Sequence, residues 1–117
     1  MSGENTKLFT LVVFVPVTHA GNVRAALASS GAGSLGNYAS CSFSSKGVGR
    51  FRPLPGSNAF IGEVGKVEEV EEERIETEVL EEKLQAILTA VKAAHPYEQP
   101  AIHVSGPLIN IDSFLKK

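Results

Sequence analysis

The sequence is short of the residue types that most often carry chemistry. It contains one cysteine (Cys41), one aspartate (Asp112) and no tryptophan. A single cysteine excludes an intrachain disulfide framework and favours a reducing compartment. The longest unbroken apolar run, Leu11–Val15, is far below the roughly 20 residues that a membrane-spanning helix needs. Because the leader Met1–Lys7 also lacks the net positive charge of a signal peptide, we expect a cytoplasmic protein without a membrane partner.

The near-neutral charge of the chain conceals an acidic block. The 117 residues have a formal net charge of −2, and 43% of them are hydrophobic, which is typical of one globular domain. Residues 1–62 carry a charge of +4, residues 63–82 carry −8 with ten glutamates, and the rest carry +2. We therefore expect the positive and negative segments to fold against each other.

Apolar periodicity predicts four strands and two helices. The expected strands are Lys7–Pro16, Asn37–Ser45, Lys66–Val79 and Ala101–Ser105, and the expected helices are His19–Ser30 and Leu80–Ala94. Thr18 is the expected N-cap of the first helix, and Gly31 is its expected C-terminal glycine. The third strand is ambiguous, because Val70 breaks its alternation. A bulge near residues 70–73 would restore the alternation, and one helix over residues 66–94 is the competing prediction.

The predicted order β-α-β-β-α-β indicates an α+β fold of the ferredoxin-like split β-α-β type. In that arrangement a four-stranded antiparallel sheet carries two helices on one face. We expect a single domain over residues 1–117, with its core at about residues 7–109 and a short C-terminal tail. Residues 47–65 hold five glycines and two prolines, which predicts a long loop of the kind that is usually functional or mobile.

Several familiar functions are excluded by pattern. Gly31–Gly36 matches G-x-G-x-x-G, but it follows a helix instead of preceding one, so it would turn the wrong end of the helix dipole toward a phosphate. The basic aromatic signature of RNA-recognition modules is missing, and we expect no nucleic-acid partner. No serine nucleophile can be matched to a histidine and an aspartate, because Asp112 lies in the tail. We therefore expect no enzymatic activity.

The segment Gly47-Val-Gly-Arg-Phe-Arg52 offers a candidate ligand site. In an extended strand, Arg50 and Arg52 share one face, and two guanidinium groups beside Gly47 and Gly49 could hold a phosphate or a carboxylate. The alternative is a solvated hairpin whose arginines pair with the nearby glutamates, since surface pairs of this kind are common. Both interpretations place the segment beside the acidic block.

The segment His95-Pro-Tyr-Glu-Gln-Pro100 ends a helix and leads into the last strand. It offers an imidazole, a phenol and a carboxylate (His95, Tyr97 and Glu98) within four residues. The alternative is a structural turn fixed by its two prolines. A divalent metal held by His95, Glu98 or His103 is a further alternative, although the sequence contains no H-x-H, H-E-x-x-H or C-x-x-C pair. No other cofactor is indicated.

Five segments resemble segments of known protein families. His95-Pro-Tyr-Glu-Gln-Pro100 and Gly65-Lys-Val-Glu68 are similar to CutA proteins. Gly36–Ser45, Gly49–Pro53 and Ile61–Lys66 more closely resemble the PII/CutA-like domain that is inserted in YqfO-type proteins of the Nif-three-like family. The resemblance covers most of residues 7–109. It implies the split β-α-β fold, a strand at Lys66–Val79 and a homotrimer, and it carries over no metal centre from the flanking halves of YqfO-type proteins.

The resemblance also implies a role. PII-like proteins place their signalling loop between the second and third strands and bind ligands in clefts between subunits. We therefore expect a non-enzymatic regulatory or ligand-binding module whose Arg50 and Arg52 hold a small anion, with His95, Tyr97 and Glu98 lining the cleft. A divalent-metal-binding protein of the CutA type, and an assembly module that joins a ring of partner proteins, are the alternatives.

Overall fold

A computed structural model of the chain describes residues 7–115. Its elements follow the order β1-α1-β2-β3-α2-β4, with two short 3-10 helices, η1 and η2. The bounds are β1 Leu8–Pro16, α1 Val17–Ser30, β2 Phe43–Phe51, β3 Glu68–Leu80, η1 Glu81–Lys83, α2 Leu84–Ala94, β4 Ala101–Ser105 and η2 Ile111–Ser113. The strands form one antiparallel sheet in the order β2-β3-β1-β4. The predicted ferredoxin-like α+β fold is confirmed.

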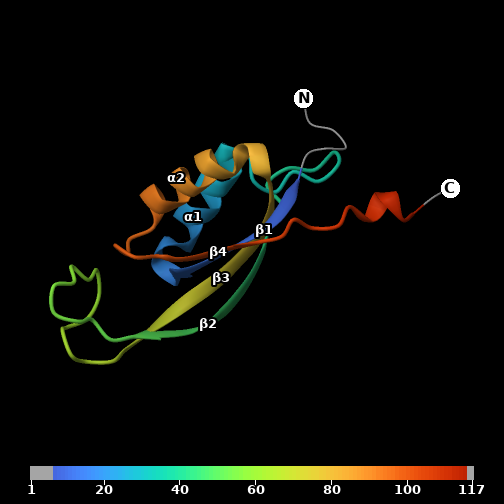
Figure 1. The fold of residues 1–117 in the computed structure, drawn as a ribbon. Helices are drawn as coiled ribbons and strands as arrows, with labels where there is room; N and C mark the ends of the chain where they lie inside the picture. Colours follow the sequence, from blue (N-terminus) through green and yellow to red (C-terminus); the bar gives the residue numbers. More distant parts are fainter. Residues whose placement is uncertain (1–6, 116–117) are drawn as a thin grey trace.

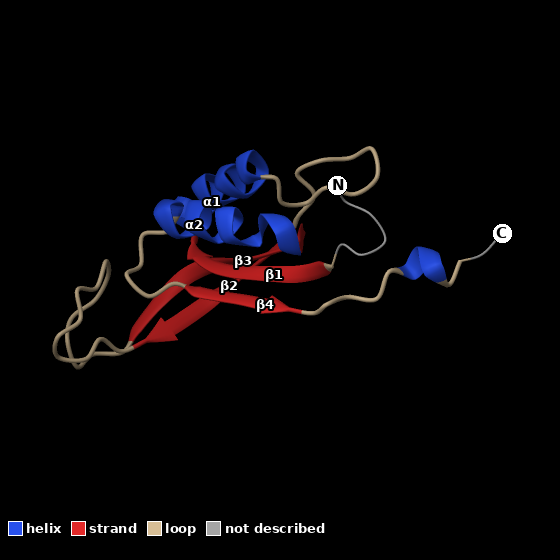
Figure 2. Cartoon of the chain, turned by 45° about the horizontal axis from the view of Figure 1, so that its top comes forward, coloured by secondary structure: helices blue, strands red, loops and turns tan. Residues whose placement is uncertain are grey.

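Both helices cover the same face of the sheet (Figures 1 and 2). Side chains that alternate along β1 and β3 point toward the helices, because successive residues of a strand face opposite sides. Together with one side of each helix they make a dry core whose members are at most 3% exposed: Leu11, Val13, Val15, Ala20, Val23, Leu27, Ala32, Ile75, Val79, Ile87 and Val91. The other face of the sheet carries no helix and is where the candidate site begins.

The second strand lies six residues later than the sequence predicts. Residues 37–42 form a loop instead of a strand, with Ser40 at a φ of 63°, and β2 runs through the glycine-rich segment that we expected to be a loop. Small apolar residues and serines alternate before Phe43, and this pattern predicted a strand with one buried face. The face does not exist, because Phe43, which would belong to it, is 66% exposed. Backbone contacts hold the loop instead: the Cys41 N–H donates to the Gly33 carbonyl at 2.9 Å. The long connection therefore covers residues 52–67.

The third strand is confirmed, but the predicted bulge and the alternative helix are wrong. Residues 68–80 pair with both neighbours in an unbroken register. Ile75, Thr77 and Val79 face the helices, whereas Val70 and Glu72 are shielded on the opposite face. The buried side of β3 therefore switches from one face to the other along the strand, although no residue is inserted. It switches because part of the strand extends beyond the helices, where other residues cover it.

The helix boundaries also differ from the prediction. Helix α1 starts at Val17, directly after β1, and Pro16 occupies its N-cap position without a side-chain cap. Thr18 is therefore inside the helix, and its hydroxyl lies 2.9 Å from the ring of His19. Gly31 ends the helix with a φ of 99°, as predicted. Leu80 belongs to β3, and a 3-10 turn that contains Glu81 and Glu82 precedes α2.

The molecule is elongated, with extents of 57 × 24 × 21 Å. The β2–β3 hairpin and its connection project from one end, and the tail after β4 projects from the other (Figure 1). Large hydrophobic side chains remain exposed at both ends, including Leu54 and Phe60 in the connection and Ile111 and Phe114 in the tail. None of the helices described within residues 7–115 is long and apolar enough to cross a membrane.

Four of the ten glutamates in the acidic block form ion pairs with cations among the described residues, and two of these cations, Arg24 and Arg50, come from the positive N-terminal segment. Glu73 accepts a hydrogen bond from Arg24 of α1, and Arg50 of β2 pairs with Glu69 across the hairpin at 2.9 Å. Both members of the second pair are more than half exposed, so we expect it to contribute at most about 1 kcal/mol to stability. Glu72 takes part in no ion pair among residues 7–115.

Candidate functional site

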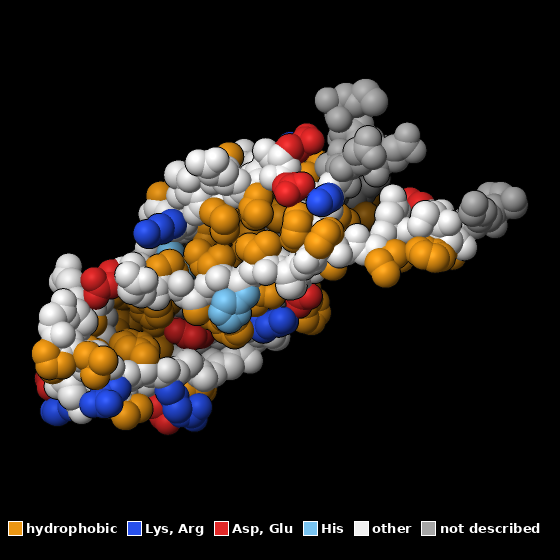
Figure 3. Space-filling view, in the orientation of Figure 1, with side chains coloured by type: hydrophobic (Ala, Val, Ile, Leu, Met, Phe, Trp, Pro, Cys, Tyr) orange, Lys and Arg blue, Asp and Glu red, His pale blue; other side chains and the backbone are white. Residues whose placement is uncertain are grey.

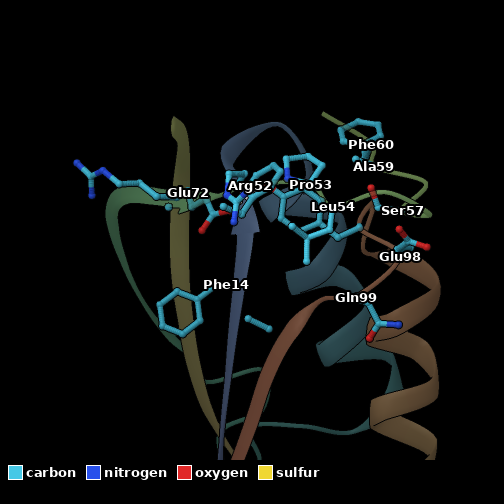
Figure 4. A pocket seen from close by; sticks show the side chains of 15 residues that line it. Phe14, Arg52, Pro53, Leu54, Ser57, Ala59, Phe60, Glu72, Glu98 and Gln99 are labelled. Atoms are coloured by element: carbon cyan, nitrogen blue, oxygen red, sulfur yellow. Dashed lines mark hydrogen bonds between the residues drawn. The ribbon is translucent and has the colours of Figure 1, made fainter. Parts of the chain in front are cut away.

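A pocket of about 470 Å³ lies where the hairpin extends beyond the helices. Its walls come from β2, from the connection after β2 and from the segment that links α2 to β4. Figure 4 shows Phe14 on one side of the cavity, Glu98 and Gln99 on the other, and Pro53 and Leu54 between them. In Figure 3, hydrophobic side chains gather around a hollow toward this end of the molecule. We call this cavity the hairpin pocket.

Aromatic rings form one wall of the hairpin pocket. The ring of Tyr97 lies at the centre of the group, with its centroid 5.6 Å from that of Phe51 and 6.5 Å from that of Phe60. Phe51 ends β2 and Phe60 lies in the connection, so the three rings come from distant parts of the sequence. Edge-to-face aromatic pairs of this kind stabilise by about 0.5–1.5 kcal/mol beyond their buried area. They fix the connection against the segment after α2.

His95 supports Tyr97 from behind. The residue is only 6% exposed, and its ring contacts that of Tyr97, with centroids 5.1 Å apart. One ring nitrogen, Nε2, lies 2.6 Å from the carbonyl oxygen of Phe14, and Nδ1 lies 3.2 Å from the backbone nitrogen of Tyr97. These partners assign the proton to Nε2, because a carbonyl only accepts and an N–H only donates. Burial lowers the pKa of His95 below its ordinary value of 6.5, so the ring is neutral at pH 7.

Glu72 forms the polar floor of the hairpin pocket. Its side chain lies over Gly49, where a β-carbon would be 2.1 Å from Oε1, and β2 offers a second glycine, Gly47, directly opposite in the register. The hydroxyl of Tyr97 donates a hydrogen bond to Oε2 at 2.9 Å. Burial of the phenol, followed by its hydrogen bond to the Glu72 carboxylate, raises the pKa of Tyr97 well above its usual value. Tyr97 is therefore a permanent donor at any physiological pH.

The predicted site residues fall into two groups. Gly49, Arg50, Arg52, Tyr97 and Glu98 all line the hairpin pocket. Within this group, Arg50 is engaged with Glu69, and the carboxylate of Glu98 accepts from the backbone N–H of Asn58 at 2.6 Å. Arg52 forms no ion pair or side-chain hydrogen bond with the described residues.

The remaining predicted residues lie outside the cavity lining. Gly47 has open space around it and does not line the hairpin pocket, and His95 lies behind Tyr97. His103 lies on the helix-free face, where its ring packs edge-on against Phe14 with centroids 6.0 Å apart. Within residues 7–115, no three histidine, cysteine or acidic side chains are grouped as a metal site would require. The structure therefore does not bring His95, Glu98 and His103 together as one ligand set.

Sequence reasoning missed Glu72, Phe51 and Phe60. Glu72 is one of several glutamates in a row, and no local feature separates it from Glu71 or Glu73. A usable signal was present in the neighbouring strand, because a glycine such as Gly49 leaves space for a large side chain on the paired strand. This signal can be used only when the pairing register of the hairpin is known. The register could not be predicted, because the second strand was placed six residues too early.

Comparison with known proteins gives relatives of one group. No protein-family model matches the chain. It is 50% identical over 103 residues to the GTP cyclohydrolase 1 type 2 homolog of Halalkalibacterium halodurans and 46% identical over 94 residues to that of Bacillus subtilis. These alignments cover 88% and 80% of the chain but only 27% and 25% of the relatives. The chain thus spans about a quarter of the length of the curated relatives it matches.

Solved structures agree with this assignment. The Bacillus cereus protein related to NIF3 is 44% identical, has a TM-score of 0.78, and is matched over 93% of this chain and 28% of its own. CutA from Archaeoglobus fulgidus has a TM-score of 0.64 at 18% identity and is matched over 92% of this chain and 91% of its own, which shows a common fold. The expected resemblance is confirmed: the chain has the fold of CutA and is homologous to one segment of the NIF3/YqfO-type proteins named GTP cyclohydrolase 1 type 2 homolog.

Proposed function

We propose that the protein is a non-enzymatic, cytoplasmic regulatory module that binds a small ligand in the hairpin pocket. The observation that carries this proposal is the pocket itself. A volume of about 470 Å³ falls within the roughly 300–1,000 Å³ of small-molecule sites, which combine apolar walls with a few polar groups. Here the apolar wall is largely aromatic, and the polar groups include Glu72, Tyr97, Arg52 and Glu98. The site lies beside the connection between β2 and β3, where PII-like proteins have their signalling loop.

We further propose that Arg52 holds an anionic group of the ligand. Arg50 is already paired with Glu69, whereas the guanidinium of Arg52 has no carboxylate partner among the described residues and lines the hairpin pocket. An arginine fork matches the geometry of a phosphate or a carboxylate. The anion site that we expected to include both Arg50 and Arg52 is therefore proposed for Arg52 alone.

Calorimetry with ATP and with inorganic phosphate tests this proposal. We expect Arg52→Ala to weaken binding about tenfold or more, since a charge-assisted hydrogen bond contributes roughly 1.5–3 kcal/mol. Arg74→Ala is the matched control, because it removes a guanidinium that pairs with Glu76 outside the hairpin pocket. Equal heats from the wild type and Arg52→Ala would remove the anion role of Arg52.

We also propose that the protein assembles as a homotrimer. Phe43 on the helix-free face of the sheet is 66% exposed, and Ile109, Ile111 and Phe114 in the tail are each at least 67% exposed. Exposed apolar side chains in this number are typical of association surfaces. Light scattering is expected to give a molar mass of about 37 kDa, three times the 12.4 kDa of one chain. A mass near 12 kDa at micromolar concentration would contradict the trimer.

A further inference from the structure

Glu72 is a buried carboxylate without a cation. Its residue is only 9% exposed, and among residues 7–115 no lysine, arginine or histidine nitrogen lies within 4.0 Å of its oxygens. Burying a carboxylate is costly unless a cation or several hydrogen-bond donors compensate for the lost water. The other buried glutamate of β3, Glu73, has such a partner in Arg24. Glu72 therefore stands out as the carboxylate whose charge the described chain leaves unbalanced.

The hydrogen bonds of Glu72 do not balance that charge either. Its single donor among the described residues is the hydroxyl of Tyr97, which reaches Oε2 at 2.9 Å. No described residue donates to Oε1, which lies over Gly49. Glu72 and Gly49 both line the hairpin pocket. The imidazole of His95, which packs against Tyr97, donates its Nε2 proton to the carbonyl of Phe14 and is neutral at pH 7. One carboxylate oxygen is thus available to a ligand.

The walls around Glu72 suit a cation as well. Phe14, Phe51, Phe60 and Tyr97 all line the same cavity, and two of these rings lie within 6.5 Å of the Tyr97 ring. The face of an aromatic ring carries negative electrostatic potential, so it attracts ammonium groups within about 6 Å of its centroid. An apolar pocket that excludes water strengthens both this attraction and the pairing with a carboxylate.

From this juxtaposition we propose that the ligand of the hairpin pocket carries an organic ammonium group, which pairs with Glu72 and lies against the aromatic wall. The inference rests on the proposed function, because it assigns the chemistry of the ligand in the same pocket. The anionic group proposed for Arg52 and the ammonium group proposed for Glu72 then belong to one ligand with charges of both signs. Its apolar part fills the space between Leu54 and Phe60.

Three compounds of nearly equal shape separate charge from size. Phenethylammonium, 2-phenylethanol and 3-phenylpropionate present a positive, a neutral and a negative group on the same phenyl arm. Their affinities for the full chain are measured by ligand-observed NMR in an amine-free buffer. We expect phenethylammonium to bind about tenfold more tightly than 2-phenylethanol. We expect Glu72→Gln, which can still accept the hydrogen bond of Tyr97, to abolish that preference.

Glu71→Gln is the control variant, since it removes the same charge from the adjacent, exposed position of β3. It should retain the tenfold preference. If 2-phenylethanol or 3-phenylpropionate binds as tightly as phenethylammonium, or if Glu72→Gln keeps the preference, the ammonium assignment is overturned while the pocket remains a ligand site. If none of the three compounds binds although ATP does, the ammonium assignment fails while the pocket remains a ligand site. If ATP does not bind either, the proposed function fails as well.

Discussion

Gly33→Ala is expected to lower the free energy of unfolding by about 3 kcal/mol, the sum of backbone strain and steric overlap. Gly33 has a φ of +79°, and a β-carbon there would lie 2.3 Å from the carbonyl oxygen of Cys41 and 2.6 Å from its nitrogen. Both are backbone atoms, so no side-chain rotation relieves the contact. The same atoms take part in hydrogen bonds from Cys41 to Gly33 and from Thr77 to Cys41. The substitution would therefore push the loop off β3.

Urea unfolding measures this effect, with Gly36→Ala as the control. Gly36 also has a positive φ, of +55°, but its β-carbon would meet no atom within 4 Å. It should cost only the strain of the left-handed conformation, about 1 kcal/mol. Equal losses for the two variants would show that residues 37–42 do not follow the described loop. That result would favour the strand that alternation predicts over Asn37–Ser45.

Gly49→Ala is expected to weaken the binding of phenethylammonium at least tenfold, because a lost charged hydrogen bond is worth roughly 1.5–3 kcal/mol. The new β-carbon would lie 2.1 Å from Oε1 of Glu72 and 2.4 Å from its Cδ. The end of a glutamate side chain can move, so the backbone is not strained. The carboxylate must then leave its position over β2 and lose its hydrogen bond to Tyr97. The pocket would keep its walls but lose its polar floor.

Gly47→Ala is a close control for this effect. Gly47 lies two residues earlier on the same face of β2, and a β-carbon there would have open space. The two variants have the same composition and the same strand propensity, so they differ only in the contact with Glu72. Affinities are compared by the same NMR titration, and unfolding by urea. Equal affinities for Gly49→Ala and Gly47→Ala would show that the position of Glu72 does not matter for binding.

The sequence was informative where one face of an element is buried. In β1 and α2 the apolar residues point into the core, so periodicity located both elements, apart from the short 3-10 turn before α2. The edge strand β2 was missed because nearly all of its residues are exposed and two are glycines. Alternation carries no signal when neither face is covered. The residues before Phe43 led to the reverse error. They alternate by chance in a loop, and such a pattern looks the same as that of a strand with one buried face.

The candidate site was predicted in part for a similar reason. Tyr97, Glu98 and Arg52 were found because the segments that contain them are distinctive in composition and resemble known relatives. Glu72 could not be found, because its importance comes from the register that places it beside Gly49 and under Tyr97. Because Glu72 is charged, any pattern of neighbouring residues also predicts that it is exposed. Buried polar residues of this kind become visible only when their partners are known.

The most direct test of the central claim, that the hairpin pocket binds a small ligand, is a map of amide chemical shifts. The ¹H–¹⁵N spectrum of the full chain is followed while phenethylammonium or ATP is added. We expect the largest shifts at the non-proline residues of 49–60 and 97–101, the two segments that contribute most of the pocket lining. Shifts confined to the loop at residues 34–42, or spread evenly over the surface, would contradict ligand binding in the hairpin pocket.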